Sequence, residues 1–175
     1  DLTRLNQIVV YEPDDLTIAV QAGCRIGELN GILAEHGQML PFEIACRAEA
    51  TLGGLYAAGI SGPRRFGHGS MRGLVIGITA VSPSGEIARG GGMVVKTVSG
   101  YDMMRMHGGA LGSLGVVVQL NFKVLPRPRA QSTVVVRYAR MAEAIGAALT
   151  VRDSQLAPTA IVLLDNGGAH FAGLD

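Results

Sequence analysis

The sequence has few aromatic residues, two cysteines and no residue pattern suited to a metal ion. Phenylalanine and tyrosine make up 5% of the 175 residues, and tryptophan is missing. The few aromatic residues in the basic middle of the chain form no base-stacking array, so nucleic acid is not expected as a partner. Cys24 and Cys46 lack the paired spacing of a zinc site, and no histidine has acids at ligand spacing. We expect no metal, and two buried or incidental thiols in a reducing compartment.

Long hydrophobic runs are missing as well. No stretch of about 18 apolar residues occurs, so the sequence predicts no membrane-spanning helix. The first residues lack the basic-then-apolar order of a signal peptide, which together with the thiols favours a cytoplasmic location. The chain begins at Asp1 rather than at a methionine, and we expect both ends to continue into a longer protein.

Glycine is abundant instead, and it is concentrated in one region. Between Gly53 and Gly115 lie 17 of the 25 glycines. Glycine lets the backbone turn sharply and approach a ligand closely, and clustered main-chain N–H groups bind pyrophosphate. The chain has no G-x-G-x-x-G, and no Walker lysine follows Gly90–Gly92. The region therefore predicts a phosphate-bearing cofactor held mostly by main chain, the alternative being that the small residues only permit tight helix packing.

The net charge of +1 conceals a strong asymmetry. Residues 61–140 carry eleven lysines and arginines against two acids, whereas residues 1–60 carry three arginines against eight acids. The basic block overlaps the glycine-rich region and favours an anionic ligand. Within it, Arg64 and Arg65 are candidates to neutralise a phosphate or a substrate carboxylate, which arginine binds with two parallel hydrogen bonds. A solvated basic face or a subunit interface is the alternative.

Hydrophobic periodicity predicts a mixture of strands and helices. Strands are expected at residues 5–11, 16–20, 74–81, 86–89 and 116–124, and a short extended segment at 38–41. A helix is expected at 25–36, ended by a left-handed Gly37, and short helices within 51–59 and 96–109. Residues 42–50 and 61–72 are expected to be loops. Beyond a stiff linker at Pro126–Arg129, the pattern predicts a strand (133–138), a helix (141–151) and a strand (160–164).

Four segments in order resemble a known family. They are T-L-G-G-x4-G-x-S-G-P-R-R from residue 51, K-x-V-x-G-Y-D from 96, G-A-L-G-S-L-G-V-V from 109 and K-V-L-P-R-P from 123. Their order resembles the PCMH-type FAD-binding domain of the vanillyl-alcohol oxidase and p-cresol methylhydroxylase superfamily, over residues 5–130. The first two segments are most similar to the E-subunit family of bacterial glycolate oxidase, or glycolate dehydrogenase. FAD subunits of molybdenum hydroxylases and enolpyruvoyl sugar reductases share the T-x-G-G cue but fit these two segments poorly.

The resemblance implies an α+β fold in two parts. Residues 1–128 would be the second half of the FAD-binding domain, mostly antiparallel sheet with flanking helices, without its N-terminal subdomain. Residues 129–175 would be the truncated start of a C-terminal α+β cap domain. For the 175-residue chain alone we expect weak FAD binding and no turnover.

The resemblance also implies where FAD lies. The main chain at Ala50–Gly54 would face the pyrophosphate, Ala57–Gly59 the ribityl and flavin side, and Gly112–Val117 the adenine and ribose. The expected FAD-binding residues are Ala50, Thr51, Leu52, Gly53, Gly54, Ala57, Ala58, Gly59, Ser61, Gly112, Gly115, Val116 and Val117. Gly73 departs from the family, which usually has an acid after Arg72, and Leu111 stands where related proteins often have glutamate. No histidine matches the family's base position, so no catalytic residue is assigned.

The implied activity is that of an FAD-binding oxidoreductase subunit. It would oxidise a 2-hydroxy acid such as glycolate, with hydride transfer to the flavin. Its expected partners are related flavoprotein and iron–sulfur subunits of a hetero-oligomeric complex, through which it would associate with the inner membrane. The alternative is a structural or assembly subunit that kept the fold without flavin redox function, to which Gly73 and the missing base point.

Overall fold

The centre of the molecule is a five-stranded antiparallel sheet. The computed structural model describes residues 2–44, 50–93 and 102–174, so Cys46 and the Lys96–Tyr101 part of the K-x-V-x-G-Y-D segment lie outside the described residues. The strand order is β1-β2-β6-β4-β5. The strands are β1 (Ile8–Glu12), β2 (Thr17–Gln21), β4 (Val75–Val81), β5 (Ile87–Gly91) and β6 (Val116–Lys123). The expected mostly antiparallel sheet is confirmed.

Strand β6 holds the two halves of the sheet together. It pairs with β2, with Phe122 opposite Ile18, and with β4, where Leu120 lies opposite Ile78. Leu120 and Phe122 are fully buried, because both project into the apolar layer between sheet and helices. A small second pair, β3 (Gln38–Met39) with β7 (Leu125–Pro126), joins the segment after the first helix to the end of β6. The chain thus returns to its first strands after nearly one hundred residues.

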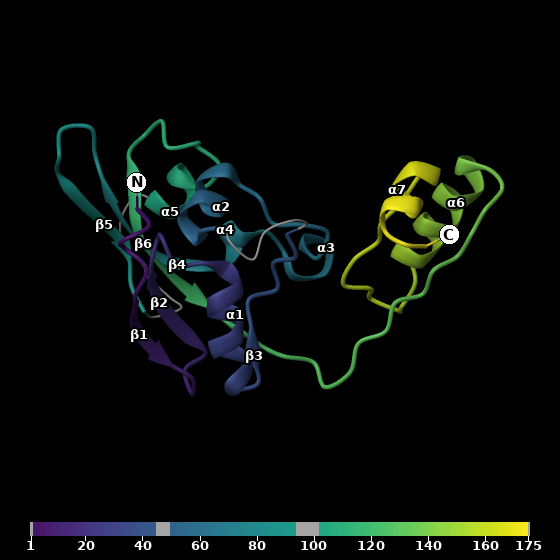
Figure 1. The fold of residues 1–175 in the computed structure, drawn as a ribbon, viewed down its shortest axis with the longest axis horizontal. Coiled ribbons are helices and arrows are strands. Elements are labelled where there is room, and N and C mark those ends of the chain that lie inside the picture. Colours follow the sequence, from purple (N-terminus) through teal and green to yellow (C-terminus); the bar gives the residue numbers. More distant parts are fainter. Residues whose placement is uncertain (1, 45–49, 94–101, 175) are drawn as a thin grey trace.

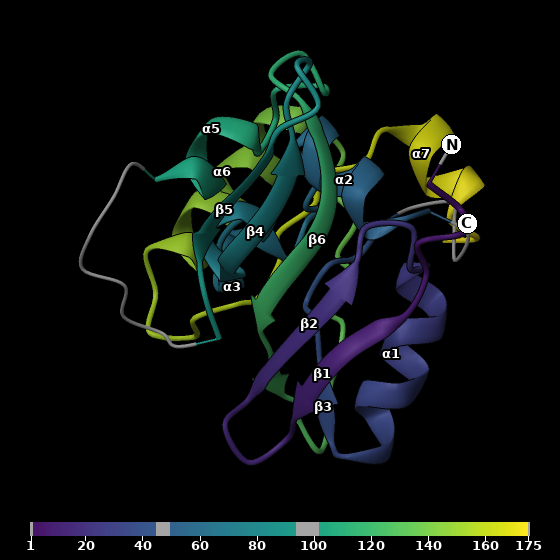
Figure 2. The same ribbon diagram turned by 90° about the vertical axis from the view of Figure 1, so that its left-hand side faces the viewer.

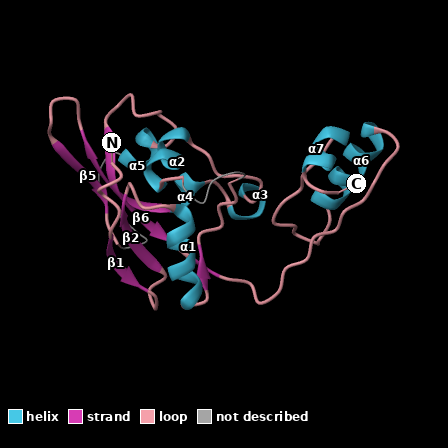
Figure 3. Ribbon diagram, in the orientation of Figure 1, coloured by secondary structure: helices cyan, strands magenta, loops and turns pink. Residues whose placement is uncertain are grey.

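Helix α1 (Ile26–Glu35) packs on one face of the sheet. Its buried residues Ile26, Leu29 and Leu33 recur at helical spacing and form one apolar stripe. The helix ends before Gly37, whose φ of +64° is the left-handed conformation that glycine adopts readily. The expected helix and its glycine end are therefore confirmed. Figures 1 and 3 show α1 on the same side of the sheet as α2, and Figure 2 views the sheet from the opposite face.

Helix α2 (Leu52–Ala58) lies very close to the end of β2. Thr51 caps it by accepting a hydrogen bond from the Gly54 N–H, at 3.3 Å between Oγ1 and N. A Cβ on Gly53 would lie 2.6 Å from the Cβ of Ala22, closer than any real contact. Glycine at position 53 is therefore required for the close packing of α2 on the sheet, which supports the tight-packing interpretation for this residue.

The segment expected to be a loop at residues 61–72 contains two short helices, so that expectation is wrong. They are α3 (Arg65–His68) and α4 (Met71–Leu74). The second one forms because Met71 and Leu74 bury their side chains in the core, while the Ser61 hydroxyl accepts a hydrogen bond from the Met71 N–H at 2.9 Å. The short helix expected within residues 96–109 is present as α5 (Met103–His107), capped by Asp102.

The C-terminal part of the described chain is helical. Helix α6 (Met141–Arg152) confirms the expected helix, and α7 (Asn166–Phe171) follows it. The strands expected at 133–138 and 160–164 are absent from the described residues, and those expectations are wrong. A β-branched run becomes a strand only when a neighbouring strand supplies hydrogen bonds. This run has no such neighbour among the described residues, and Val134 is 83% exposed. In Figure 1 an extended segment joins these helices to the sheet.

Candidate functional site

The structure brings the two segments expected to bind FAD side by side. The Gly109 N–H donates to the Tyr56 carbonyl at 3.0 Å, and the Leu111 N–H donates to the Ala57 carbonyl at 2.8 Å. A Cβ on Gly59 would lie 3.3 Å from the Cα of Gly109. The last turn of α2 and the loop of residues 108–115 therefore form one continuous surface, which we call the glycine seam.

The thirteen expected residues divide by exposure along and below this seam. Five are exposed: Gly54, Ala58, Gly59, Gly112 and Val116. Ala50, Thr51 and Ala57 are half-buried, and the other five, Leu52, Gly53, Ser61, Gly115 and Val117, are buried. The side chains at these five buried positions pack inside the protein or, at the glycines, are absent. A ligand could therefore contact these residues only through main-chain atoms.

The first turn of α2 already uses its main-chain donors. The Leu52 N–H donates to the Cys24 carbonyl at 2.9 Å, and the Gly53 N–H donates to the Ala22 carbonyl at 2.8 Å. The N–H groups at a helix start are the usual anion donors of a phosphate-binding helix. A phosphate at this end of α2 would have to share or displace these protein acceptors.

The 108–115 loop is built from tight turns. Gly109 and Gly112 have φ values of +83° and +77°, which glycine adopts without steric cost. Leu111 has a φ of +52° although it is not glycine, and its side chain is 78% exposed. Its strained backbone is held by the hydrogen bond to α2, and strain of this kind concentrates at functional sites.

Exposed apolar side chains surround the seam. Ile60, Met106, Leu114 and Val116 are each about half exposed. Apolar residues gathered in one region of a surface mark a site of contact with another molecule. With no side chain on the glycines between them, they provide a surface suited to a flat group with an apolar face.

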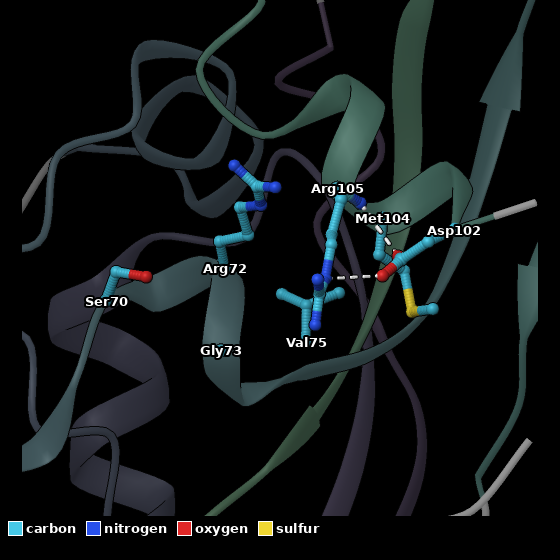
Figure 4. A pocket seen from close by; sticks show the side chains of 7 residues that line it. All are labelled: Ser70, Arg72, Gly73, Val75, Asp102, Met104 and Arg105. Atoms are coloured by element: carbon cyan, nitrogen blue, oxygen red, sulfur yellow. Dashed lines mark hydrogen bonds and ion pairs between the residues drawn. The ribbon is translucent and has the colours of Figure 1, made fainter.

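Two adjoining cavities open beside the seam, and Ser70 and Arg72 line both. The larger, of about 370 Å³, is lined by Ser70, Arg72, Gly73, Val75, Asp102, Met104 and Arg105 (Figure 4). The smaller, of about 180 Å³, is lined by Tyr56, Gly59, Ser61, Arg65, Ser70, Met71, Arg72 and Gly108. Because Gly59 belongs to the seam, the smaller cavity is continuous with it.

Tyr56 forms part of the wall of the smaller cavity and braces the site. Its hydroxyl donates a hydrogen bond to the Met104 carbonyl and so joins α2 to α5. Burial, and to a smaller extent the negative charge of Asp102, raise the pKa of Tyr56 to about 12, while Arg72 opposes the shift. The hydroxyl is therefore protonated at neutral pH and is unsuited to act as a base. The sequence contained no signal for this role.

The structure separates the two arginines that the sequence had grouped. The guanidinium of Arg64 lies 3.0 Å from a carboxylate oxygen of Glu43 and donates to the Gln131 side chain at 3.1 Å. Arg65, in contrast, lines the smaller cavity. Arg64 thus ties neighbouring segments together, whereas Arg65 is placed to meet a ligand. Arg72, which sequence reasoning did not place in a site, lies at the junction of the cavities, and only the basic character of its region signalled it.

Other candidate groups lie apart from this site. Cys24 is buried, and burial raises the pKa of its thiol. Within the described residues, no three His, Cys, Asp or Glu side chains gather as metal ligands. None of the helices in the described part of the chain is long and apolar enough to cross a membrane.

Comparison with known proteins places the chain in a family. Residues 1–91 match the model of a family described as an FAD binding domain. The chain is 44% identical over 124 residues to glycolate oxidase subunit GlcE of Escherichia coli, a match that covers 70% of this chain and 35% of that protein. It is 29% identical over 162 residues to glycolate oxidase subunit GlcD of Bacillus subtilis, covering 93% of this chain and 34% of that one.

A third relative broadens the set beyond glycolate oxidases. The chain is 31% identical over 166 residues to the mitochondrial D-lactate dehydrogenase [cytochrome] 1 of Saccharomyces cerevisiae, covering 94% of this chain and 28% of that protein. The chain spans about a third of the length of the curated relatives it matches. It belongs to the FAD binding domain family, and FAD is its cofactor. The exposed glycine seam with its apolar surroundings fits that group.

Proposed function

We propose that this chain is part of an FAD-dependent oxidoreductase that oxidises a 2-hydroxy acid, with glycolate as the first candidate. The observation that carries the proposal is the glycine seam, where two segments resembling FAD contacts meet through the Gly109 and Leu111 hydrogen bonds to α2. The relatives' names support the substrate class, since glycolate, D-lactate and D-2-hydroxyglutarate are all 2-hydroxy acids.

Within this proposal the thirteen expected residues form the FAD surface. The exposed Ala58 and Gly59 lie along the ribityl and flavin side, Thr51 and Gly54 face the pyrophosphate, and Gly112 and Val116 face the adenine and ribose. Residues 1–128 form this part of the FAD-binding domain, and residues 129–175 begin a second domain. The buried members of the set hold the backbone of the exposed ones in place.

The chain's own residues bind and orient, while flavin, when bound, accepts the hydride of the substrate. A base must take the hydroxyl proton, and it must lie within hydrogen-bond reach of the substrate. Tyr56 does not supply it, because its pKa is raised to about 12 and its hydroxyl is committed to Met104. We propose that the base comes from another part of the full-length protein or from a partner subunit.

The proposed partners are a related flavoprotein subunit and an iron–sulfur subunit. The names of the GlcE and GlcD relatives, both given as glycolate oxidase subunits, support a complex of more than one chain. Reconstitution should therefore be attempted with the neighbouring subunits as well as with the single protein.

The test is anaerobic reduction of the purified full-length protein, alone and with its co-expressed partners. Visible flavin absorbance should bleach on addition of glycolate or D-lactate. Acetate, which lacks the 2-hydroxyl group, is the matched control and should leave the spectrum unchanged. Bleaching by none of the hydroxy acids, in protein that contains flavin, would reject the proposed substrate class.

A structural or assembly subunit is the second candidate. It is favoured by the occupied N–H groups of Leu52 and Gly53, which leave fewer donors for a phosphate. A colourless protein in every preparation supports this candidate, and stoichiometric flavin that a hydroxy acid reduces rejects it.

A further inference from the structure

Arg72 is held in place at the junction of the two cavities. A Cβ on Gly108 would lie 3.4 Å from both Cγ and Cδ of Arg72 and 3.3 Å from Cζ of Tyr56. The stem of Arg72 therefore passes close to the bare backbone of Gly108 and near the Tyr56 ring. Figure 4 shows its guanidinium directed away from the Ser70 hydroxyl and from the Arg105–Asp102 pair. The side chain is exposed, so its guanidinium is accessible to a ligand.

Within the described part of the chain, the guanidinium of Arg72 has no carboxylate partner. Asp102 is the carboxylate that lines the larger cavity, and it already pairs with Arg105, at 2.6 Å between Nε and Oδ2. Among the residues that the structure describes, neither Arg72 nor Arg65 forms an ion pair. Of the described residues, those that line the smaller cavity include these two arginines and no carboxylate. Two free guanidinium groups in one hollow favour an anion that accepts paired hydrogen bonds.

We propose that Arg72 and Arg65, with the hydroxyl of Ser70, bind the carboxylate of the substrate. The inference rests on the proposed function and deepens it by locating the substrate's anionic end. The smaller cavity, of about 180 Å³, has room for a carboxylate group, while the rest of a substrate can extend into the adjoining cavity or along the seam. Gly59 lines the same cavity, which places the arginines next to the proposed flavin side of the seam.

An FAD phosphate has the same acceptor chemistry as a carboxylate, so flavin content and oxalate affinity must be measured separately. Position 73 offers a way to change the charge beside Arg72. Gly73 lines the larger cavity next to Arg72, and a Cβ there would meet no atom within 4 Å. Its φ is not in the left-handed region. Gly73→Asp therefore introduces a carboxylate beside Arg72 without a steric conflict, and Gly73→Asn is the matched neutral control.

The experiment uses the full-length protein with its partner subunits. Three quantities are measured in each variant: flavin content, KM for the acid that bleaches the flavin, and the dissociation constant of oxalate by calorimetry. Oxalate carries carboxylates but has no C–H bond from which a hydride could be transferred, so its binding can be measured without turnover. Gly73→Asp and Arg72→Gln should each weaken oxalate and raise KM at least about tenfold, the effect of losing one charge-assisted hydrogen bond.

Gly73→Asn should change KM and the oxalate dissociation constant by less than about threefold. Arg72→Lys should keep part of the oxalate affinity that Arg72→Gln loses, because lysine has the positive charge but not the paired donors of the guanidinium group. Equal behaviour of Gly73→Asp and Gly73→Asn overturns the inference. Loss of flavin with unchanged oxalate affinity also overturns it and assigns the arginines to an FAD phosphate. A colourless wild-type protein rejects the proposed function instead, and its oxalate affinity still decides whether the arginines bind a carboxylate.

Discussion

Replacing Gly53 by alanine should destabilise the protein, although alanine is the better helix former. The new Cβ would lie 2.6 Å from the Cβ of Ala22 and 3.0 Å from its carbonyl oxygen. Relief to an ordinary carbon contact of about 3.6 Å requires α2 to move by about 1 Å. Overpacking of this kind costs about 1–3 kcal/mol, and helix propensity returns about 1 kcal/mol. The expected net loss is therefore up to about 2 kcal/mol of unfolding free energy.

The same displacement carries a functional signature. Moving α2 stretches the hydrogen bonds from Gly109 and Leu111 to its last turn, so the seam should open and FAD affinity should fall. Gly31→Ala in α1 is the matched control, because a Cβ there meets nothing within 4 Å and the position is exposed. It should stabilise the protein by about 0.5–1 kcal/mol.

The assay is urea unfolding of the full-length protein followed by far-ultraviolet circular dichroism, with flavin release measured in parallel. Gly53→Ala should unfold at lower urea than wild type, and Gly31→Ala at higher urea. A Gly53→Ala protein as stable as Gly31→Ala, with wild-type flavin affinity, would refute the close-packing argument.

Three further predictions concern single side chains. Tyr56→Phe should lower stability by about 1 kcal/mol, because it removes a part-buried hydrogen bond to the Met104 carbonyl. Since the folded pKa of Tyr56 is raised from 10.0 to about 12, the wild type should also lose stability as pH rises from about 10 to about 12, and the Phe variant should lack that loss in pH-dependent melting. Leu111→Gly should raise the melting temperature, by relief of about 1 kcal/mol of left-handed strain, whereas Leu111→Ala should not. Arg64→Ala should change the unfolding free energy by no more than about 1 kcal/mol, because the ion pair of Arg64 with Glu43 is partly exposed. It should leave oxalate affinity unchanged in calorimetry. A tenfold change in that affinity would place Arg64 in the anion site.

Local sequence patterns predicted most elements of the sheet domain. Alternation predicted β1 and β2, whereas β4 and β6 were predicted from apolar, β-branched runs typical of buried strands. The sequence pattern does not tell which strands pair with each other. The position of β6 between β2 and β4 is known only from the structure. In the C-terminal segment a similar apolar, β-branched run gave a wrong strand prediction, since Val134 and its neighbours find no partner strand among the described residues.

Short helices were harder to predict than strands. Helix α4 spans Met71–Leu74 and is too short for any helical period to show. Helix α7 is capped by Asp165, whose side chain accepts a hydrogen bond from the Gly168 N–H at 2.7 Å. Its two glycines have low helix propensity, so the sequence did not predict a helix after Asp165.

The candidate site was partly predictable. The resemblance pointed to residues on α2 and in the 108–115 loop, but their adjacency depends on hydrogen bonds between residues more than fifty positions apart. Arg72 had no distinguishing signal, because its setting is made by Tyr56, Gly108 and Asp102 from other elements. Arg64 and Arg65 are adjacent in sequence, and only the position of Glu43 separates their roles.

The most direct test of the central claim, that the glycine seam holds FAD, is an FAD titration of the flavin-stripped full-length protein and two glutamate variants. Ala58→Glu puts a negative charge on the exposed seam, and Ala142→Glu puts the same charge on exposed α6. Wild type and Ala142→Glu should bind FAD stoichiometrically and Ala58→Glu should bind it at least about tenfold more weakly, with all three equally stable. Equal FAD affinity in all three, or no binding by wild type, would contradict the claim.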